Sequence, residues 1–85
     1  MATSRQIRAA RALLGWTQQG LADRSLVAIN TVNAIEKDQP YPKDDTVQAV
    51  IEALEKAGIV FIADGVQGEG VRFSKPRPKP TRRPR

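Results

Sequence analysis

The 85-residue chain has room for one small domain, and a domain of this size buries only a modest fraction of its surface. It contains no cysteine and no histidine, which excludes disulfides, thiolate metal sites, histidine acid–base chemistry and the commonest zinc ligand. No apolar run approaches the roughly 18 residues that a membrane span needs, and no signal peptide opens the chain. These features predict a soluble, cytoplasmic protein with no metal and no cofactor.

Apolar spacing and capping residues predict four helices, at about residues 4–14, 18–24, 28–37 and 44–58. Ser4, Thr17 and one of Asp44 and Asp45 are the expected N-caps of the first, second and fourth helices, and Gly15 is expected to end the first. The predicted core positions are Ile7, Ala10, Leu13, Leu14, Leu21, Ala22, Val32, Ile35, Val47, Val50, Ile51 and Leu54.

The hydrophobic period changes after the fourth helix. Residues 59–63 are a short apolar run rich in β-formers, a glycine-rich turn follows, and residues 71–74 are the expected return strand, so this segment predicts a β-hairpin. The chain then ends in SKPRPKPTRRPR, where frequent prolines exclude a helix and a central strand and predict an extended segment. The expected organisation is a domain at 1–58, a hairpin at 59–74 and a flexible tail at 75–85.

The net charge of +5 lies in that tail. Residues 1–73 hold 8 Lys or Arg against 9 Asp or Glu, a balance of −1, whereas residues 74–85 hold 6 basic residues and no acidic one. Such a block predicts an arm that contacts a polyanion or, equally, a disordered solubilising end. The expected phosphate contacts of this arm are Lys75, Arg77, Lys79, Arg82 and Arg83.

The predicted helices at 18–24 and 28–37 are joined by a tight turn inside a four-helix shell, which is the helix-turn-helix arrangement. In that arrangement the first helix lies across the DNA backbone, and the second, the recognition helix, enters the major groove with its N-terminal residues at the base edges. The expected partner is therefore double-stranded DNA.

The segment LLGWTQQGLADRS, followed by TVNAIEK, resembles the Cro/phage-repressor-like regulators, the xenobiotic-response-element (XRE) family, over about residues 4–57. The resemblance implies a mainly α, λ-repressor-like helix-turn-helix domain and a transcriptional regulator rather than an enzyme. The family pattern is met by Leu14, Gly15, Thr17, Gln18, Leu21, Ala22, Thr31, Val32, Ile35 and Glu36.

The resemblance also implies roles for single residues. Gln18 would contact a DNA phosphate from a helix N-terminus and buttress a base-contacting side chain. Arg11 and Glu36 would form a structural pair that ties the first helix to the third. The expected DNA-contacting set is Thr17, Gln18, Ala28, Ile29, Asn30, Thr31, Asn33, Ala34, Lys37 and Lys43.

Three residues depart from the family pattern. Leu26 replaces a frequent turn glycine, and because a left-handed conformation is costly for leucine, the turn is expected to use other dihedral angles. Ala28 replaces the usual Ser or Thr cap, and Gly20 lies inside a helix where Glu is common. Each change costs about 1 kcal/mol in local propensity.

The outward positions at the start of the third helix carry no Arg or Lys, which disfavours guanine recognition. They are expected to be Ala28, Ile29, Asn30, Asn33 and Ala34. Asparagine can bond bidentately to adenine, and an apolar side chain can contact a thymine methyl group. The sequence thus favours a repressor that binds an operator through amides and methyl contacts.

Two alternatives stay open. The first alternative is a protein-binding adaptor, such as an antitoxin or anti-activator. In that case Leu26, Ile29 and the hairpin would form a patch that binds a protein partner. Generic nucleic-acid binding through the tail comes third. Other chemistry is poorly supported, because Asp44 and Asp45 suit a helix cap better than a catalytic pair and no helix follows the glycines of DGVQGEG.

A lone two-stranded hairpin is marginal in water, and Ile59 and Phe61 alternate with Val60 and Ile62, so one helix layer leaves apolar surface uncovered. We therefore expect the hairpin to complete a symmetric dimer, by strand pairing or by packing on the partner's fourth helix. Two recognition helices would then meet half-sites about one DNA turn apart.

Overall fold

The computed structural model describes residues 2–40, 42–63, 65–66 and 68–75. These residues form the predicted architecture, a four-helix λ-repressor-like domain followed by an antiparallel hairpin. The basic tail after Lys75 lies outside the described residues. No helix in the described ranges is long and apolar enough to cross a membrane. The elements are α1 (Ser4–Leu14), α2 (Gln18–Ser25), α3 (Ile29–Glu36), α4 (Asp44–Lys56), β1 (Ile59–Ile62) and β2 (Gly70–Phe73).

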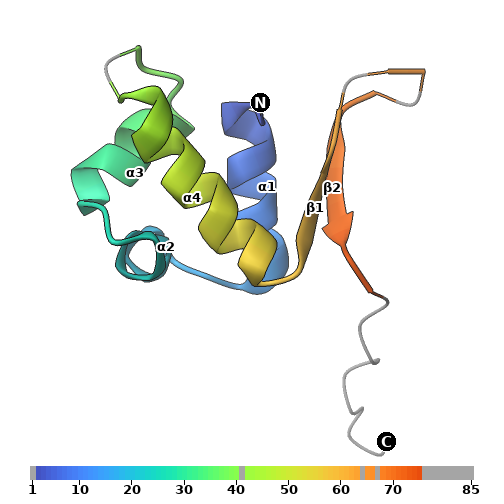
Figure 1. Cartoon of the computed structure of the whole chain (residues 1–85), viewed down its shortest axis with the longest axis horizontal. Helices are drawn as coiled ribbons and strands as arrows, with labels where there is room; N and C mark the ends of the chain where they lie inside the picture. Colours follow the sequence, from blue (N-terminus) through green and yellow to red (C-terminus); the bar gives the residue numbers. More distant parts are fainter. Residues whose placement is uncertain (1, 41, 64, 67, 76–85) are drawn as a thin grey trace, which may run out of the picture.

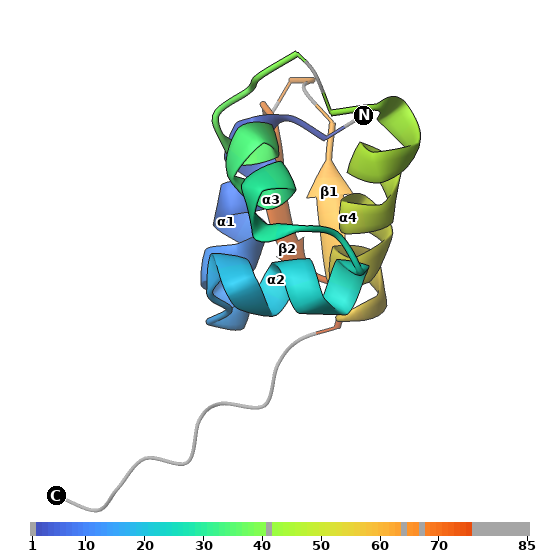
Figure 2. The same cartoon turned by 90° about the vertical axis from the view of Figure 1, so that its left-hand side faces the viewer.

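Three layers organise the domain. Helices α1 and α4 lie in the middle, with α2 and α3 on one side and the hairpin on the other (Figure 1). Figure 2 looks from the α2 and α3 side and shows the hairpin behind the other helices, with β2 beside α1 and β1 beside α4. The apolar faces of the four helices meet in one core, and its largest fully buried side chains are Ile7, Leu21, Leu54, Val32 and Val50.

The predicted N-cap residue is confirmed for α2 but was wrong for α1 and α4. Thr17 caps α2 as predicted, since its side chain accepts a hydrogen bond from the Gly20 N–H. The prediction of Ser4 as the cap of α1 was wrong: Thr3 accepts from the Gln6 N–H while the Gln6 side chain accepts from the Thr3 N–H, a reciprocal capping box.

The acidic pair at the start of α4 also behaves differently from the prediction. Lys43 occupies the N-cap position, with no side-chain capping bond, and Asp44 and Asp45 lie in the first turn of the helix. Carboxylates in that turn are stabilised by the positive end of the helix dipole, so these residues favour the helix start without capping it.

Two burial predictions were wrong. Leu13 is 44% exposed, because it lies about 100° around α1 from Leu14 and so misses the stripe that Ile7, Ala10 and Leu14 form. Ala34 is buried at 1% exposure rather than facing outward. Ala34 lies in the last turn of α3, and its carbonyl accepts a hydrogen bond from the Gln39 N–H, beyond the end of the helix.

The hairpin packs on its own helices. Phe61 pairs with Val71 and Ile59 with Phe73, and all four side chains belong to or pack against the core. Val60 pairs with Arg72 on the opposite face.

The buried side chain of Gln6 anchors the far end of the hairpin. Its Nε2 donates to the carbonyls of Ile62 (2.7 Å) and Gly70 (2.9 Å). Glu69, beside this end, accepts hydrogen bonds from Thr3 and Arg5. The start of α1 therefore holds the hairpin in place within one chain.

Candidate nucleic-acid interface

The turn between α2 and α3 keeps the geometry of a glycine turn although it carries leucine. Leu26 is left-handed, with φ 60° and ψ 40°, so the prediction of other dihedral angles was wrong. The N–H groups of Leu26 and Val27 both bond the Ala22 carbonyl, and these capping bonds require the left-handed residue. The Leu26 side chain points into solvent and is 92% exposed.

The first turn of α3 presents its side chains outward. Ala28 is the N-cap and makes no side-chain capping bond, which agrees with the weak start that the sequence indicates. Ile29 is 39% exposed, Asn30 is exposed, and Thr31 is half-buried. The start of the recognition helix is therefore accessible, whereas the buried Ala34 has no surface to offer to DNA.

A chain of polar contacts links α1, α2 and α3 behind this surface. Glu36 is buried at 3% exposure, and its carboxylate accepts two hydrogen bonds from Arg11, from Nε at 2.8 Å and from Nη2 at 3.0 Å. Gln18 Nε2 donates to the same carboxylate at 3.0 Å. Asn33 Nδ2 lies 3.5 Å from Gln18 Oε1, at the long end for a hydrogen bond. The pair of Arg11 and Glu36 that the family resemblance implies is thus present as a bidentate ion pair.

These hydrogen bonds determine which way the side-chain amides of Gln18 and Asn33 are turned. An ionised carboxylate only accepts hydrogen bonds, so the NH₂ group of Gln18 must face Glu36. The carbonyl oxygen of Gln18 then faces Asn33 and requires the NH₂ group of Asn33 on its side. Asn33 is left with one N–H and its Oδ1 for another partner.

Basic residues flank the recognition helix rather than lying on it. Lys37 follows α3 directly, Lys43 precedes α4, and both are exposed. Arg24 stacks over the Trp16 ring, 4.2 Å from its centroid, and so covers a half-buried side chain that packs against the core.

The position of Arg24 also explains why residue 20 is a glycine. A Cβ at this position would lie 3.2 Å from Arg24 Nη1 and 3.3 Å from Thr17 Oγ1, tighter than ordinary contacts. The absence of a side chain leaves room both for the folded-back guanidinium and for the cap of α2.

The structure brings together most of the expected contact residues on the side of α2 and α3, although Thr17 is committed to capping. Lys75 is exposed after β2, and Arg77, Lys79, Arg82 and Arg83 lie outside the described residues. One candidate was missed from sequence: exposed Arg8, whose Nη1 donates to the Glu36 carbonyl. Its spacing of three from Arg11 was the available signal, because residues three apart share a helix face.

The comparison with known families agrees with this geometry. The family model described as helix-turn-helix matches residues 7–58, which is more than half of the chain. The chain belongs to this family, the XRE or Cro/CI-like helix-turn-helix proteins, and is a DNA-binding regulator. No curated protein matched the chain.

Proposed function

We propose that this protein is a sequence-specific, dimeric transcriptional repressor whose recognition helix binds a half-site containing adjacent adenine and thymine. Asn33 bonds the adenine, and Ile29 contacts the thymine methyl group. The observation that carries the proposal is the oriented chain from Arg11 through Glu36 and Gln18 to Asn33.

The orientation of Asn33 suits adenine. In the major groove adenine offers the N7 acceptor beside the N6 amino donor, and an asparagine amide matches both. One N–H of Asn33 faces Gln18, so the second N–H is free for N7 while Oδ1 accepts from the amino group. Asn30 is exposed and carries no contact of this kind among the described residues, which makes it the less well-ordered of the two amides.

Ile29 and Ala28 give the apolar part of the surface. Ile29 precedes Asn33 by four residues, so the two share one face of α3. Guanine is usually bound by Arg or Lys, and none lies in the first turn of this helix. The composition therefore supports contacts to A·T pairs.

The free face of the hairpin is the proposed dimer surface. It carries half-buried Val60, Ile62 at 37% exposure, and exposed Arg72. This face points away from α3, since the layer of α1 and α4 lies between them (Figure 1). Layers pack roughly 10 Å apart, so two recognition helices held by facing hairpins are separated by roughly 50 Å or more. That exceeds one DNA turn, and we propose half-sites two turns apart instead of the one turn that the sequence suggested.

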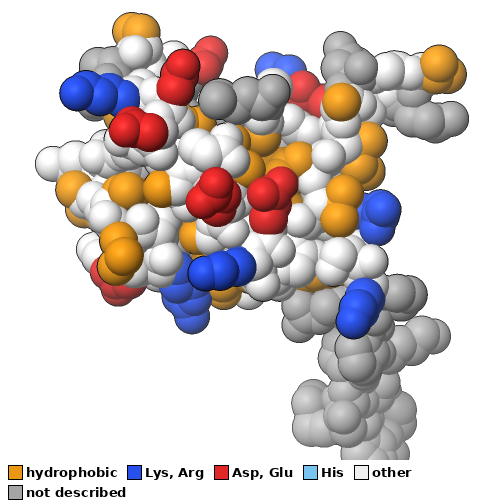
Figure 3. Space-filling view, in the orientation of Figure 1, with side chains coloured by type: hydrophobic (Ala, Val, Ile, Leu, Met, Phe, Trp, Pro, Cys, Tyr) orange, Lys and Arg blue, Asp and Glu red, His pale blue; other side chains and the backbone are white. Residues whose placement is uncertain are grey.

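Repression follows from occupancy, because a dimer bound across a promoter excludes RNA polymerase. The basic tail is proposed to add contacts to phosphates that do not depend on sequence. Figure 3 shows acidic and basic side chains mixed on one face of the domain, which agrees with its small net charge, and we propose that cations of the tail supply the additional positive charge.

A protein-binding adaptor is the second candidate, and Leu26 is the observation that favours it. This apolar side chain is almost fully exposed, and it sits in a backbone conformation that glycine would adopt at lower cost. Leu26 lines a groove of about 610 Å³ whose other lining residues include Ala49 and Ala53 and the charged side chains of Arg24, Glu52, Glu55 and Lys56.

Binding selection from random duplex DNA tests the proposal. Wild type should enrich an A·T-containing half-site, Asn33→Ala should lose preference at one base pair, and Asn30→Ala should keep it. Each good contact is worth roughly 1–3 kcal/mol of discrimination. Enrichment of a guanine-dominated half-site contradicts the assignment, and no enrichment at all favours the adaptor.

A further inference from the structure

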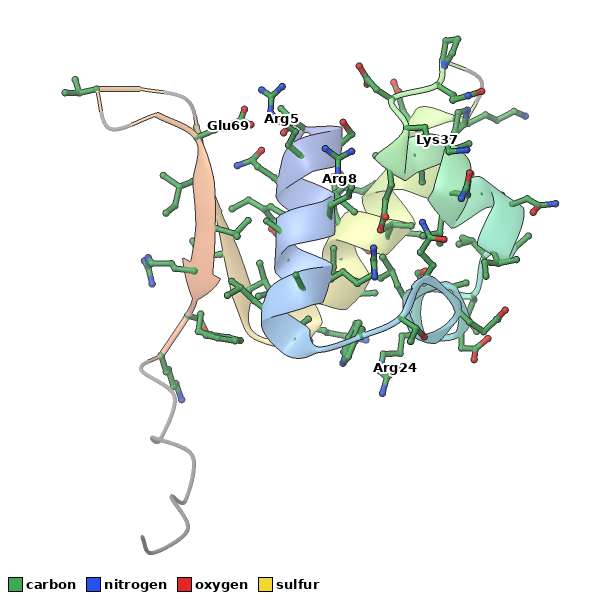
Figure 4. The ribbon with its side chains drawn as sticks, turned by 180° about the vertical axis from the view of Figure 1, so that it is seen from behind. Arg5, Arg8, Arg24, Lys37 and Glu69 are labelled. Carbon is green, nitrogen blue, oxygen red and sulfur yellow. The ribbon has the colours of Figure 1, made fainter. Side chains whose placement is uncertain are left out.

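We infer that Arg8, on α1, contacts a DNA phosphate next to the C-terminal end of the recognition helix. Arg8 is exposed and its Nη1 donates to the backbone carbonyl of Glu36, the last residue of α3. Figure 4 shows it on the side of α1 that faces α3, whereas Arg5 lies toward Glu69 and the hairpin. The inference rests on DNA binding through α2 and α3.

Besides Arg11, two polar side chains bond Glu36, and a lysine follows Glu36 in the chain. The Gln18 amide bonds the Glu36 carboxylate, Arg8 bonds the Glu36 carbonyl, and Lys37 is the next residue in the chain. Gln18 is an expected phosphate contact, and Lys37 belongs to the expected DNA-contacting set. Arg8 therefore places a third donor beside them, contributed by a different helix.

The charge of Arg8 is not used within the domain. Arg11 neutralises the carboxylate of Glu36, and neither ion pair in the described part of the chain includes Arg8. A guanidinium has five N–H donors, and the structure gives Arg8 one bond, to a neutral carbonyl. The remaining N–H groups can bond a phosphate, for which the arginine geometry is well suited.

Helix capping is the competing role, because a cation at the last carbonyl of α3 also complements the helix dipole. The two roles differ in what they predict for Arg8→Gln. Glutamine can still donate to the carbonyl, but it has no charge to exchange for a counterion. A cap is thus largely kept, while a phosphate contact is lost.

The experiment measures the affinity of the full chain for a mixed-sequence duplex against salt concentration, by fluorescence anisotropy. Each phosphate contact makes the slope of log K against log salt more negative by about 0.9. Arg8→Gln should therefore make the slope less steep by about 0.9 and weaken binding roughly fivefold to tenfold near 0.1 M salt. Arg8→Lys should keep the slope. Arg5→Gln is the matched control on the same helix and should also leave it unchanged.

An unchanged slope in Arg8→Gln, or an equal loss in Arg5→Gln, overturns the assignment while leaving DNA binding intact. A lower melting temperature with the wild-type slope assigns Arg8 to capping alone. Absence of any binding by wild type overturns the proposed function itself, and with it this contact.

Discussion

Gln18 Nε2 donates a 3.0 Å hydrogen bond to Glu36 Oε1, and this contact sets which end of the Gln18 amide faces the recognition helix. The acceptor is buried and paired with Arg11, so its position is fixed by the core rather than by solvent. A structural ion pair is thereby connected to a surface amide two contacts away. The Gln18 contact thus restrains Asn33, the side chain that we propose contacts a base, before DNA arrives, which lowers the entropy lost on binding.

Removal of Arg11 should destabilise the domain strongly. Arg11→Met leaves the Glu36 carboxylate buried without its cation, and breaking such a pair costs about 3–5 kcal/mol. The free energy of unfolding, measured by urea denaturation, checks this value. Arg5→Met is the control: its pair with Glu69 has a 72% exposed arginine side chain, and the loss should be under about 1 kcal/mol. Equal losses in the two variants would contradict the role assigned to the buried pair.

Replacing Leu26 with glycine should stabilise the fold. The left-handed conformation costs leucine about 1–2 kcal/mol, part of which is offset by the greater flexibility of glycine in the unfolded chain. A gain of roughly 0.5–1 kcal/mol corresponds to a rise of a few degrees in melting temperature for a domain of this size. Calorimetry measures it. Asp38→Gly, at the other non-glycine position with positive φ among the described residues, should gain less, because aspartate tolerates this region better. A destabilised Leu26→Gly would mean that the leucine side chain packs on something in the folded protein.

The hairpin face should control the oligomeric state. Ile62→Asp places a charge in the proposed interface and should convert a dimer to a monomer in sedimentation at tens of micromolar. Val66→Asp is the matched control, since Val66 is fully exposed but lies in the turn and off the face. On DNA, the wild-type dimer should prefer half-sites two turns apart. A wild type that is monomeric both free and on DNA would refute the dimer.

The tail should act on all sequences alike. A chain truncated after Ser74 loses 6 cations and should bind every duplex more weakly, with a flatter dependence of log K on log salt. The ratio of operator affinity to mixed-sequence affinity should stay nearly constant. A truncated chain with the full wild-type slope would show that the tail makes no phosphate contact.

Local patterns predicted the helices and the hairpin well. These predictions rest on residues close together in the sequence. Helical spacing located the helices, Thr17 is the N-cap of α2, and Gly15 ends α1 in a left-handed conformation. The misplaced cap of α1 has a local cause as well, because the reciprocal pair of Thr3 and Gln6 was present in the sequence. The burial of Ala34 was not predictable in this way, since it depends on how α3 packs in the tertiary structure rather than on the pattern within the helix.

The candidate site was predictable in part. The family resemblance placed Gln18 and the pair of Arg11 and Glu36, but it could not say which asparagine Gln18 meets. That choice depends on how α2 crosses α3, a tertiary relationship with no sequence signal of its own. The conformation of Leu26 was also not predictable from its residue type. Leucine disfavours the left-handed conformation, but the capping bonds to the Ala22 carbonyl outweigh that preference.

The most direct test of the central claim is a double-mutant cycle between Asn33 and its base. In the selected half-site, 7-deazaadenine replaces adenine and removes the N7 acceptor, and binding of wild type and Asn33→Ala to both duplexes is measured by titration. We predict that the modified base weakens binding of wild type by roughly 1–3 kcal/mol and has little effect on binding of Asn33→Ala, so that the two changes are strongly coupled. Equal losses in wild type and Asn33→Ala, with the coupling falling on Asn30 instead, would contradict it.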